Sequence, residues 1–250
     1  MHVERITRYP VKGLSPEELD EVELTAGEGM PGDRQFAFAQ GDSGFDPAAP
    51  VWMKKRNFAC LAVNAKVAAL RTGYDPVTRV LTLQHGGGAT LIADLSKAEG
   101  RRDAAAWMTA FLGEEARGAL TLAEAPGHAF TDIPDKAVSI IGLASIADLG
   151  ERMGVELDPV RFRANILLSG ATPFAEFDLV GREAMLGGAR VRVFHRIQRC
   201  AATEVNPATT ERDAPVPRAL RKQYGHADMG VYAEVLDGGR LRMGDTLTRL

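Results

Sequence analysis

The sequence RFRANILLSG at residues 161–170 alternates apolar and polar side chains, and this period of two predicts a β-strand over 161–169. One face receives the apolar Phe162, Ala164, Ile166 and Leu168, and the other receives Arg161, Arg163, Asn165 and Ser169. Residues two apart on a strand lie about 6.6 Å from each other on the same side. Arg163 and Asn165 can therefore contact one ligand, with the guanidinium binding an anion and the amide forming hydrogen bonds with the polar edge of a ring. Taken alone, the segment favours the simpler interpretation, a solvated sheet face.

The sequence RVRVFHRIQRC at residues 190–200 predicts a second strand, which breaks into a loop directly after Cys200. Reactive groups are often exposed where a strand ends in a loop. Cys200 lies next to Arg199 and near Arg196, and positive charge favours the thiolate, which is both a nucleophile and a soft metal ligand. The alternative is a small buried apolar side chain, and it fits Cys60 better than Cys200.

Short strands separated by turns dominate the rest of the chain. Further strands are expected over 3–9, 22–25 and 35–39, with hairpins joining 79–83 to 90–92 and 231–236 to 240–243. Helical spacing covers 142–153 and also 94–112, where Ala106, Trp107, Ala110 and Phe111 form one stripe. These patterns predict a mainly β protein with covering helices, of the α+β class, built as two packed β-barrel-like parts.

Composition excludes several classes of protein. The 250 residues include 30 Lys and Arg against 33 Asp and Glu, so the net charge of −3 argues against a general polyanion binder. The longest stretch without a charged residue, 80–93, contains three glycines and is shorter than the ~20 apolar residues of a membrane span. The N-terminal MHVER has no signal-peptide pattern, so we expect no membrane association and a cytoplasmic location.

Common metal and nucleotide motifs are also missing from the sequence. The five histidines show no close pairing with each other or with a cysteine, which disfavours a zinc site. The two cysteines are half the four that an iron–sulfur cluster usually takes, so such a cluster would belong to a partner protein. The glycines at 86–88 precede no Gly-Lys-Ser/Thr and indicate a turn. The basic run at 54–56 is typical of a solvated edge unless other cations converge on it.

Several segments taken together resemble the MOSC family. They are RYPVKG at 8–13, PGDR at 31–34, RFRANI at 161–166, QRC at 198–200 before EVNP at 204–207, and Gly-Asp at 244–245. The resemblance is to two-part members, with an N-terminal β-barrel and a C-terminal MOSC domain, the group that contains the mitochondrial amidoxime-reducing component and its bacterial relatives. It implies a MOSC N-terminal domain over 1–118 and a MOSC domain over 119–250.

This resemblance also implies a molybdenum cofactor (molybdopterin) at the junction of the two parts. Cys200 matches the cysteine that binds molybdenum and is the expected catalytic residue. The expected cofactor contacts are Lys12, Arg34 and Arg56 from the first part, and Arg163, Asn165 and Arg199 from the second. Cations and an amide suit an anionic, planar pterin phosphate, and a thiolate suits a thiophilic metal.

The activity implied by the resemblance is the reduction of small N-hydroxylated or N-oxygenated compounds by a molybdenum-cofactor-dependent oxidoreductase. Electrons would come from a separate iron–sulfur, haem or flavin protein, since no ferredoxin-like domain and no membrane anchor are present in the sequence. The alternative is a non-catalytic carrier of the cofactor or of sulfur, held as a persulfide on Cys200. A nucleic-acid-binding barrel ranks last, because only 6% of residues are aromatic. Gln198 stands where some relatives have a small hydroxyl residue.

Overall fold

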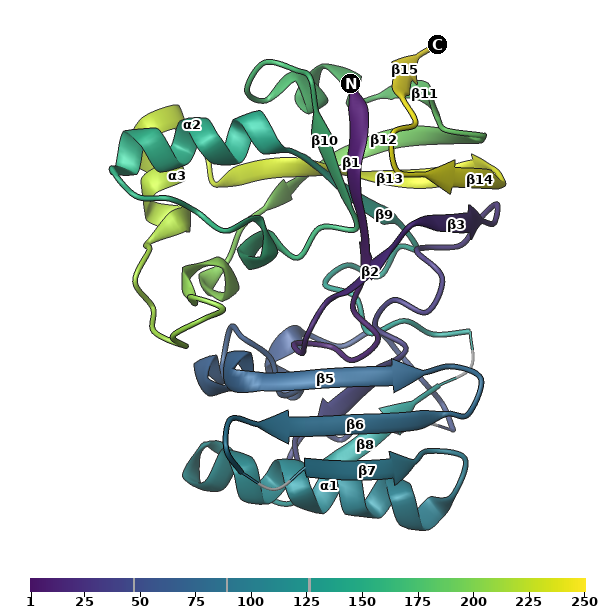
Figure 1. Cartoon of the computed structure of the whole chain (residues 1–250), viewed down its shortest axis with the longest axis vertical. Helices are drawn as coiled ribbons and strands as arrows, with labels where there is room; N and C mark the ends of the chain where they lie inside the picture. Colours follow the sequence, from purple (N-terminus) through teal and green to yellow (C-terminus); the bar gives the residue numbers. More distant parts are fainter. Residues whose placement is uncertain (47, 89, 126) are drawn as a thin grey trace.

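Two lobes make up the computed structural model, which describes residues 1–46, 48–88, 90–125 and 127–250 (Figure 1). The upper lobe in the view holds both chain ends and an eight-stranded sheet. The sheet runs in the order β15 (Leu247–Arg249), β11 (Arg182–Leu186), β12 (Ala189–Gln198), β13 (Asp228–Asp237), β9 (Val138–Gly142), β10 (Ile166–Ser169), β1 (His2–Arg8) and β2 (Glu17–Leu19).

The N-terminal strand completes this upper sheet. β1 pairs antiparallel with β10, and Ile6 lies opposite Ile166. The neighbouring β9 and β10 are parallel, and such a pair needs a long crossover, which here contains helix α2 (Leu143–Met153). Because β1 lies in this sheet, residues 9–13 leave it directly toward the junction between the lobes.

Side chains from the two faces of the upper sheet form separate cores. Ile140 belongs to a core shared with β12 and β13, whereas the adjacent Ile141 packs with α2 and with helix α3 (Val216–Tyr224). Alternation along a strand produces this division. α2 ends at Gly154, whose left-handed φ of 70° suits a glycine at a helix C-terminus.

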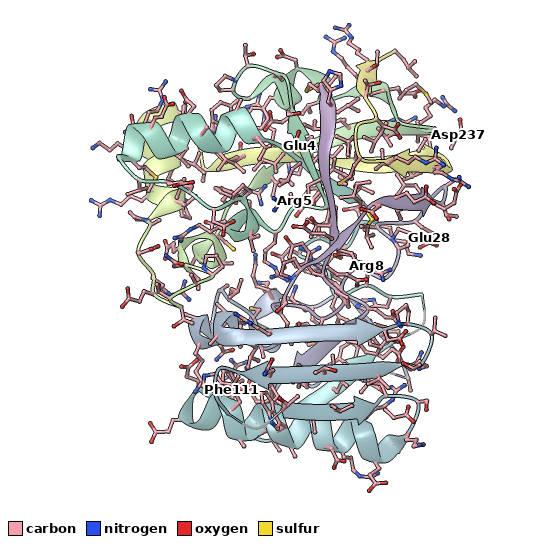
Figure 2. All side chains as sticks on the ribbon, in the orientation of Figure 1. Glu4, Arg5, Arg8, Glu28, Phe111 and Asp237 are labelled. Atoms are coloured by element: carbon pink, nitrogen blue, oxygen red, sulfur yellow. The ribbon has the colours of Figure 1, made fainter. Side chains whose placement is uncertain are left out.

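The lower lobe contains two smaller sheets and one long helix. Strands β4 (Phe36–Ala39) and β8 (Thr121–Glu124) form one sheet, and β5 (Leu70–Asp75), β6 (Val80–His85) and β7 (Thr90–Asp94) form the other. Helix α1 (Ala98–Leu112) packs Ala104, Met108 and Leu112 into the core of this lobe. Figure 2 shows side chains filling both lobes, with Arg8 at their junction.

Short 3₁₀ helices supply most of the remaining regular structure. They span η1 (Lys55–Asn57), η2 (Ala65–Ala69), η3 (Gly113–Glu115), η4 (Pro159–Phe162), η5 (Ala175–Leu179) and η6 (Ala201–Glu204). A last pair of strands, β3 (Glu21–Leu24) and β14 (Gly239–Arg242), joins the two ends of the chain. With three α-helices and fifteen strands in the described residues, the predicted α+β class with barrel-like parts is confirmed.

Three details of the predicted elements are wrong. The strand expected over 161–169 begins only at Ile166, because η4 ends at Arg163, whose left-handed φ of 51° interrupts the extended backbone. The hairpin expected over 231–243 does not form, since β14 pairs with β3 rather than with β13. On α1 the buried stripe includes Met108, while Trp107 and Phe111 stack on each other at its flank, 5.7 Å apart.

Candidate functional site

A cavity of about 480 Å³ lies between the lobes and takes residues from both. Seven cationic side chains and three carboxylates line it, so its charge balance favours an anionic ligand. The cations are Lys12, Arg34, Lys55, Arg161, Arg163, Arg196 and Arg199, and the carboxylates are Asp33, Asp132 and Asp135.

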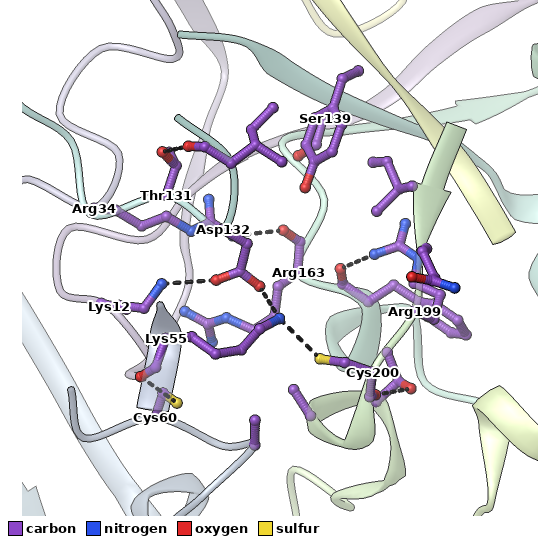
Figure 3. Close-up of a pocket in the computed structure, with 18 of the residues that line it drawn as sticks. Lys12, Arg34, Lys55, Cys60, Thr131, Asp132, Ser139, Arg163, Arg199 and Cys200 are labelled. Carbon is purple, nitrogen blue, oxygen red and sulfur yellow. Dashed lines mark hydrogen bonds and ion pairs between the residues drawn. The ribbon is translucent and has the colours of Figure 1, made fainter. Parts of the chain in front are cut away.

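Cys200 lines this cavity at the point where β12 ends and η6 begins. The thiol is half-buried, and the Nζ of Lys55 donates a hydrogen bond to its Sγ over 3.2 Å (Figure 3). The two residues belong to different lobes, so the contact joins them across the cavity. Cys200 therefore has a half-buried sulfur beside a cation, and cysteines in such an environment act as ligands or nucleophiles.

Asp132 holds two lysines beside Cys200. Its Oδ1 accepts from Lys12 Nζ at 2.7 Å and its Oδ2 accepts from Lys55 Nζ at 2.6 Å, as Figure 3 shows. Lys12 is buried and also donates to the Phe130 carbonyl, whereas the Asp132 side chain keeps 40% of its surface accessible because it faces the cavity. Burial opposes ionisation of Asp132, but the two lysines outweigh it and hold its pKa well below the usual range.

The same ion pairs keep Lys55 charged. Burial lowers the pKa of Lys55, yet the attraction of Asp132 and then of Cys200 is larger in total and raises it above the ordinary value. Lys55 therefore stays protonated at neutral pH and remains a donor to the cysteine sulfur.

Two arginines of the cavity, the half-buried Arg163 and the buried Arg199, have no carboxylate partner among the described residues. Arg163 donates through Nη1 to the Leu14 carbonyl at 2.8 Å, and Arg199 donates through Nε to Met229 O at 2.7 Å. In each, Nη2 is buried without a hydrogen-bond partner in the described chain. Burial lowers the pKa of both guanidinium groups to about 10, so they remain charged at neutral pH. Such uncompensated buried charges are costly, and an anion in the cavity would offset them.

Gly230 provides the space for the Arg199 guanidinium. Its φ of +78° is in the left-handed region, and a Cβ built there would lie 2.9 Å from Arg199 Nη2 and 2.6 Å from the Ile140 carbonyl oxygen. A side chain therefore does not fit without movement of the sheet backbone or of Arg199. The ring of Phe162 lies beneath the same guanidinium, 5.5 Å from its Cζ.

Arg34 is compensated in a way that Arg163 is not. Its Nη1 forms an ion pair with Asp33, and its Nη2 donates to the Arg163 carbonyl at 3.1 Å. Burial lowers the pKa of Arg34, but the Asp33 and Asp132 carboxylates together outweigh it and raise the pKa. The sequence segment PGDR therefore supplies both a cation and its partner.

Asn165 lines the cavity but is mainly bound to the protein. Its Oδ1 accepts from the backbone N–H of Ser139 at 3.1 Å and from its hydroxyl at 2.7 Å, and its Nδ2 donates to the Thr7 carbonyl at 3.1 Å. These bonds tie the segment before β10 to β1 and β9. The amide keeps one further N–H for a ligand.

Six of the seven residues expected at the site line the cavity, namely Lys12, Arg34, Arg163, Asn165, Arg199 and Cys200. Arg56 is exposed and is not among the lining residues, whereas Lys55 is. Successive residues of a 3₁₀ helix point about 120° apart, so in η1 a shift of one position separates the cavity from solvent. Cys60 is buried as expected, and burial raises its thiol pKa, although it also reaches the cavity wall.

Lys55, Asp132 and Arg161 were missed as candidate site residues. In the sequence Lys55 is only one member of a basic run, and Asp132 lies in a loop without a periodic pattern. Arg161 donates to Asp213 at 2.7 Å and is buried at the cavity wall. The strand predicted over 161–169 gave no indication of this position.

Family models match almost the whole chain. The model of the MOSC domain matches residues 125–248, and that of the MOSC N-terminal beta barrel domain matches residues 1–120. The chain belongs to the MOSC family. This membership makes it a molybdenum-cofactor-associated protein.

Curated relatives of this MOSC protein include two mitochondrial amidoxime reducing components. The component 2 of Bos taurus is 28% identical over 174 residues, which are 59% of this chain and 51% of that protein. The component 2 of Homo sapiens is 30% identical over 119 residues, 43% of this chain and 35% of that protein. The MOSC protein thus matches about half the length of the bovine relative, and less of the human one.

Two solved structures are also similar to the MOSC protein. The YUAD protein from Bacillus subtilis aligns over 98% of this chain and 93% of its own, with 15% identity and a TM-score of 0.46. YiiM from Geobacillus stearothermophilus aligns over 45% of this chain and 53% of its own, with 24% identity and a TM-score of 0.36. In the described parts of the MOSC protein, none of the helices has the length and apolar character needed to span a membrane.

The donor set of the cavity fits the cofactor associated with the family. Molybdopterin is an anionic group, and the cavity offers an excess of cations. Three guanidinium nitrogens of its lining residues are buried without a partner in the described chain, namely Nε of Arg161 and Nη2 of Arg163 and Arg199. Molybdenum is thiophilic, and the Cys200 sulfur is half-buried at the cavity wall. A cavity in which a carboxylate paired with every cation would leave no positive charge for an anionic cofactor.

Proposed function

We propose that this MOSC protein binds the molybdenum cofactor between its lobes and reduces N-hydroxylated or similarly N-oxygenated small molecules. The observation that carries the proposal is the position of Cys200 in a cavity whose cations exceed its carboxylates, and whose Arg163 and Arg199 have no anionic partner among the residues that the structure describes. The names of the curated relatives, amidoxime reducing components, support the substrate class.

Each residue has a proposed task toward the cofactor. Cys200 would bind the metal, and the cofactor's anionic groups would be held by Lys12, Arg34, Lys55, Arg163 and Arg199, with the remaining N–H of Asn165 as a donor. Of the expected contacts, the part assigned to Arg56 passes to Lys55, which reaches the cavity. When bound, the cofactor supplies two-electron oxygen-atom transfer at molybdenum.

The chain's own residues control charge and protons near the reaction. Reduction of a hydroxylamine-type N–OH to N–H consumes two electrons and two protons and releases water. Lys55 carries a proton at Nζ beside the cysteine sulfur, and Asp132 keeps it there by holding it in an ion pair. We also propose that the electrons come from a separate protein, which carries an iron–sulfur, haem or flavin group.

Two further features are proposals from the sequence. The boundary between the N-terminal domain and the MOSC domain is set at residues 118 and 119, although β1 to β3 lie with the strands of the upper lobe. The location of the protein is taken to be cytoplasmic.

The experiment is a reduction assay on protein purified from cells that make the cofactor. Wild type and Cys200→Ala are supplied with a chemically reduced viologen dye as electron source and with an amidoxime as substrate. We expect turnover by wild type and none by the variant, with Cys60→Ala as the thiol control that retains turnover. Cofactor-loaded wild type that reduces no N-oxygenated compound, but transfers its cofactor or sulfur to an acceptor protein, would overturn the enzyme proposal in favour of a carrier.

A further inference from the structure

The ring of Tyr9 lies against two guanidinium groups of the cavity. The Cζ of Arg163 is 4.0 Å from the ring centroid and that of Arg34 is 5.2 Å from it. Tyr9 is only 2% exposed, so the ring and the cations meet in a largely desolvated region, where the attraction between a cation and an aromatic ring is strongest. Both arginines line the cavity, and they come from the N-terminal and the C-terminal half of the sequence.

The backbone of Tyr9 fixes one of these arginines as well. Its N–H donates to Asp33 Oδ1 at 2.8 Å, and its carbonyl accepts from the backbone N–H of Arg34 at 2.7 Å. Arg34 and Arg163 have φ values of 49° and 51°, a left-handed conformation that is unfavourable for side chains with a Cβ. Both residues thus adopt an unfavourable backbone conformation beside the same ring, and such strain persists only where the surrounding contacts hold it.

The charges of this cluster do not cancel. Arg34 pairs with Asp33, but Arg163 has no carboxylate partner in the described chain, and its Nη2 is buried without an acceptor. Arg34 Nη2 also donates to the Arg163 carbonyl, which keeps the two like-charged residues together. An aromatic ring can hold both cations without neutralising either, whereas a second carboxylate would compete with an anionic ligand.

We infer that Tyr9 is a positioning residue, which holds Arg34 and Arg163 together as the receptor for one phosphate-like oxyanion. The inference rests on the proposed function in taking the anionic end of the cofactor as the natural ligand. The receptor itself is built from the chain alone, so it is expected to bind a simple oxyanion of the same chemistry.

The test measures pyrophosphate binding to cofactor-free protein by titration calorimetry, at a temperature well below the unfolding of every variant. Tyr9→Leu removes the ring, Tyr9→Phe keeps the ring without its hydroxyl, and Tyr74→Leu removes a ring that packs on Phe36, outside the residues lining the cavity. We expect about tenfold weaker binding in Tyr9→Leu, and changes under about twofold in the other two. Unchanged binding in Tyr9→Leu, or equal losses in Tyr9→Leu and Tyr9→Phe, would overturn the inference.

A second measurement separates positioning from a general loss of packing. In an Arg163→Met background the ring has one fewer cation to hold, so Tyr9→Leu is expected to weaken binding much less than in wild type. Equal losses in both backgrounds would contradict an action through Arg163. In protein from cofactor-making cells, Tyr9→Leu is also expected to retain less pterin, measured by fluorescence after oxidation.

The two proposals fail in different ways. Wild type that retains molybdenum but ignores pyrophosphate would overturn the inference and leave the proposed function in place. Pyrophosphate binding that depends on the Tyr9 ring, in a protein that never retains molybdenum, would support the receptor and overturn the proposed function.

Discussion

Replacing Gly230 with alanine tests whether this glycine is needed to position Arg199. The added Cβ would lie 2.6 Å from Ile140 O and 2.9 Å from Arg199 Nη2, at a φ of +78°. Gly225→Ala is a matched control, because Gly225 has a φ of +79° and no atom within 4 Å of the built Cβ. Both variants carry the same backbone strain, so their difference isolates the steric effect.

The magnitudes follow from these distances. Placing alanine in the left-handed region costs about 1 kcal/mol after allowance for the stiffer unfolded chain, and Gly225→Ala should lose about this much stability. Overpacking a closely fitted interior adds about 1–3 kcal/mol, so we expect a loss of about 3 kcal/mol for Gly230→Ala. At about 2–4 °C per kcal/mol for a chain of this size, the melting temperature should fall by about 6–12 °C, against about 2–4 °C for the control.

Thermal unfolding followed by circular dichroism measures both shifts, and metal analysis of protein from cofactor-making cells shows the effect on the site. Gly230→Ala should also retain less molybdenum than Gly225→Ala, because the displaced guanidinium belongs to Arg199, which directly precedes Cys200 in the sequence and lines the same cavity. Equal melting temperatures for the two variants would refute the argument that Gly230 makes room for Arg199.

The other predictions concern the charged and polar groups around Cys200. Asp132→Asn leaves the buried Lys12 without its carboxylate, and we expect a loss of about 2 kcal/mol at pH 7, below the usual figure for a buried pair because Asp132 is partly exposed. Folding lowers the pKa of Asp132, so its stabilisation is present above the ordinary pKa near 4 and declines as the pH falls. In denaturant titrations, the difference in the free energy of unfolding between wild type and Asp132→Asn should therefore shrink by about 1 kcal/mol between pH 5 and pH 3. A difference that stays constant over this range would contradict the prediction. Lys55→Met should lower cofactor retention several-fold, whereas Arg56→Met should leave it unchanged, because Arg56 is exposed and Lys55 contacts Cys200. Equal losses in the two variants would contradict the conclusion that Arg56 faces away from the cavity. Asn165→Ala leaves the Ser139 N–H and the Thr7 carbonyl without partners and should destabilise the apo protein by about 2–4 kcal/mol in chemical denaturation, whereas a change under about 0.5 kcal/mol would indicate that water replaces the amide.

The sequence was informative where local pattern determines structure. The alternation through Val191 and Val193 predicts β12, because one face of that strand is buried and the other is exposed. The family motifs located most of the cavity, since Lys12, Arg163 and Cys200 lie in segments whose spacing is distinctive.

Features that depend on tertiary contacts were not predictable in this way. Whether Lys55 or Arg56 faces the cavity depends on the rotation of one turn of η1, and β14 finds its partner in β3, more than two hundred residues earlier. Arg163 breaks the expected strand because its backbone turns left-handed where its guanidinium meets Tyr9. Asp132 carries no local signal at all, and its role emerges only when Lys12 and Lys55 converge on it.

The central claim is that the Cys200 sulfur binds molybdenum in the cavity between the lobes. The most direct measurement is the molybdenum content per chain of wild type, Cys200→Ala and Cys60→Ala, purified in parallel from a host that makes the cofactor. We expect wild type and Cys60→Ala to carry comparable metal and Cys200→Ala to carry much less. Equal molybdenum in Cys200→Ala and wild type would contradict the claim.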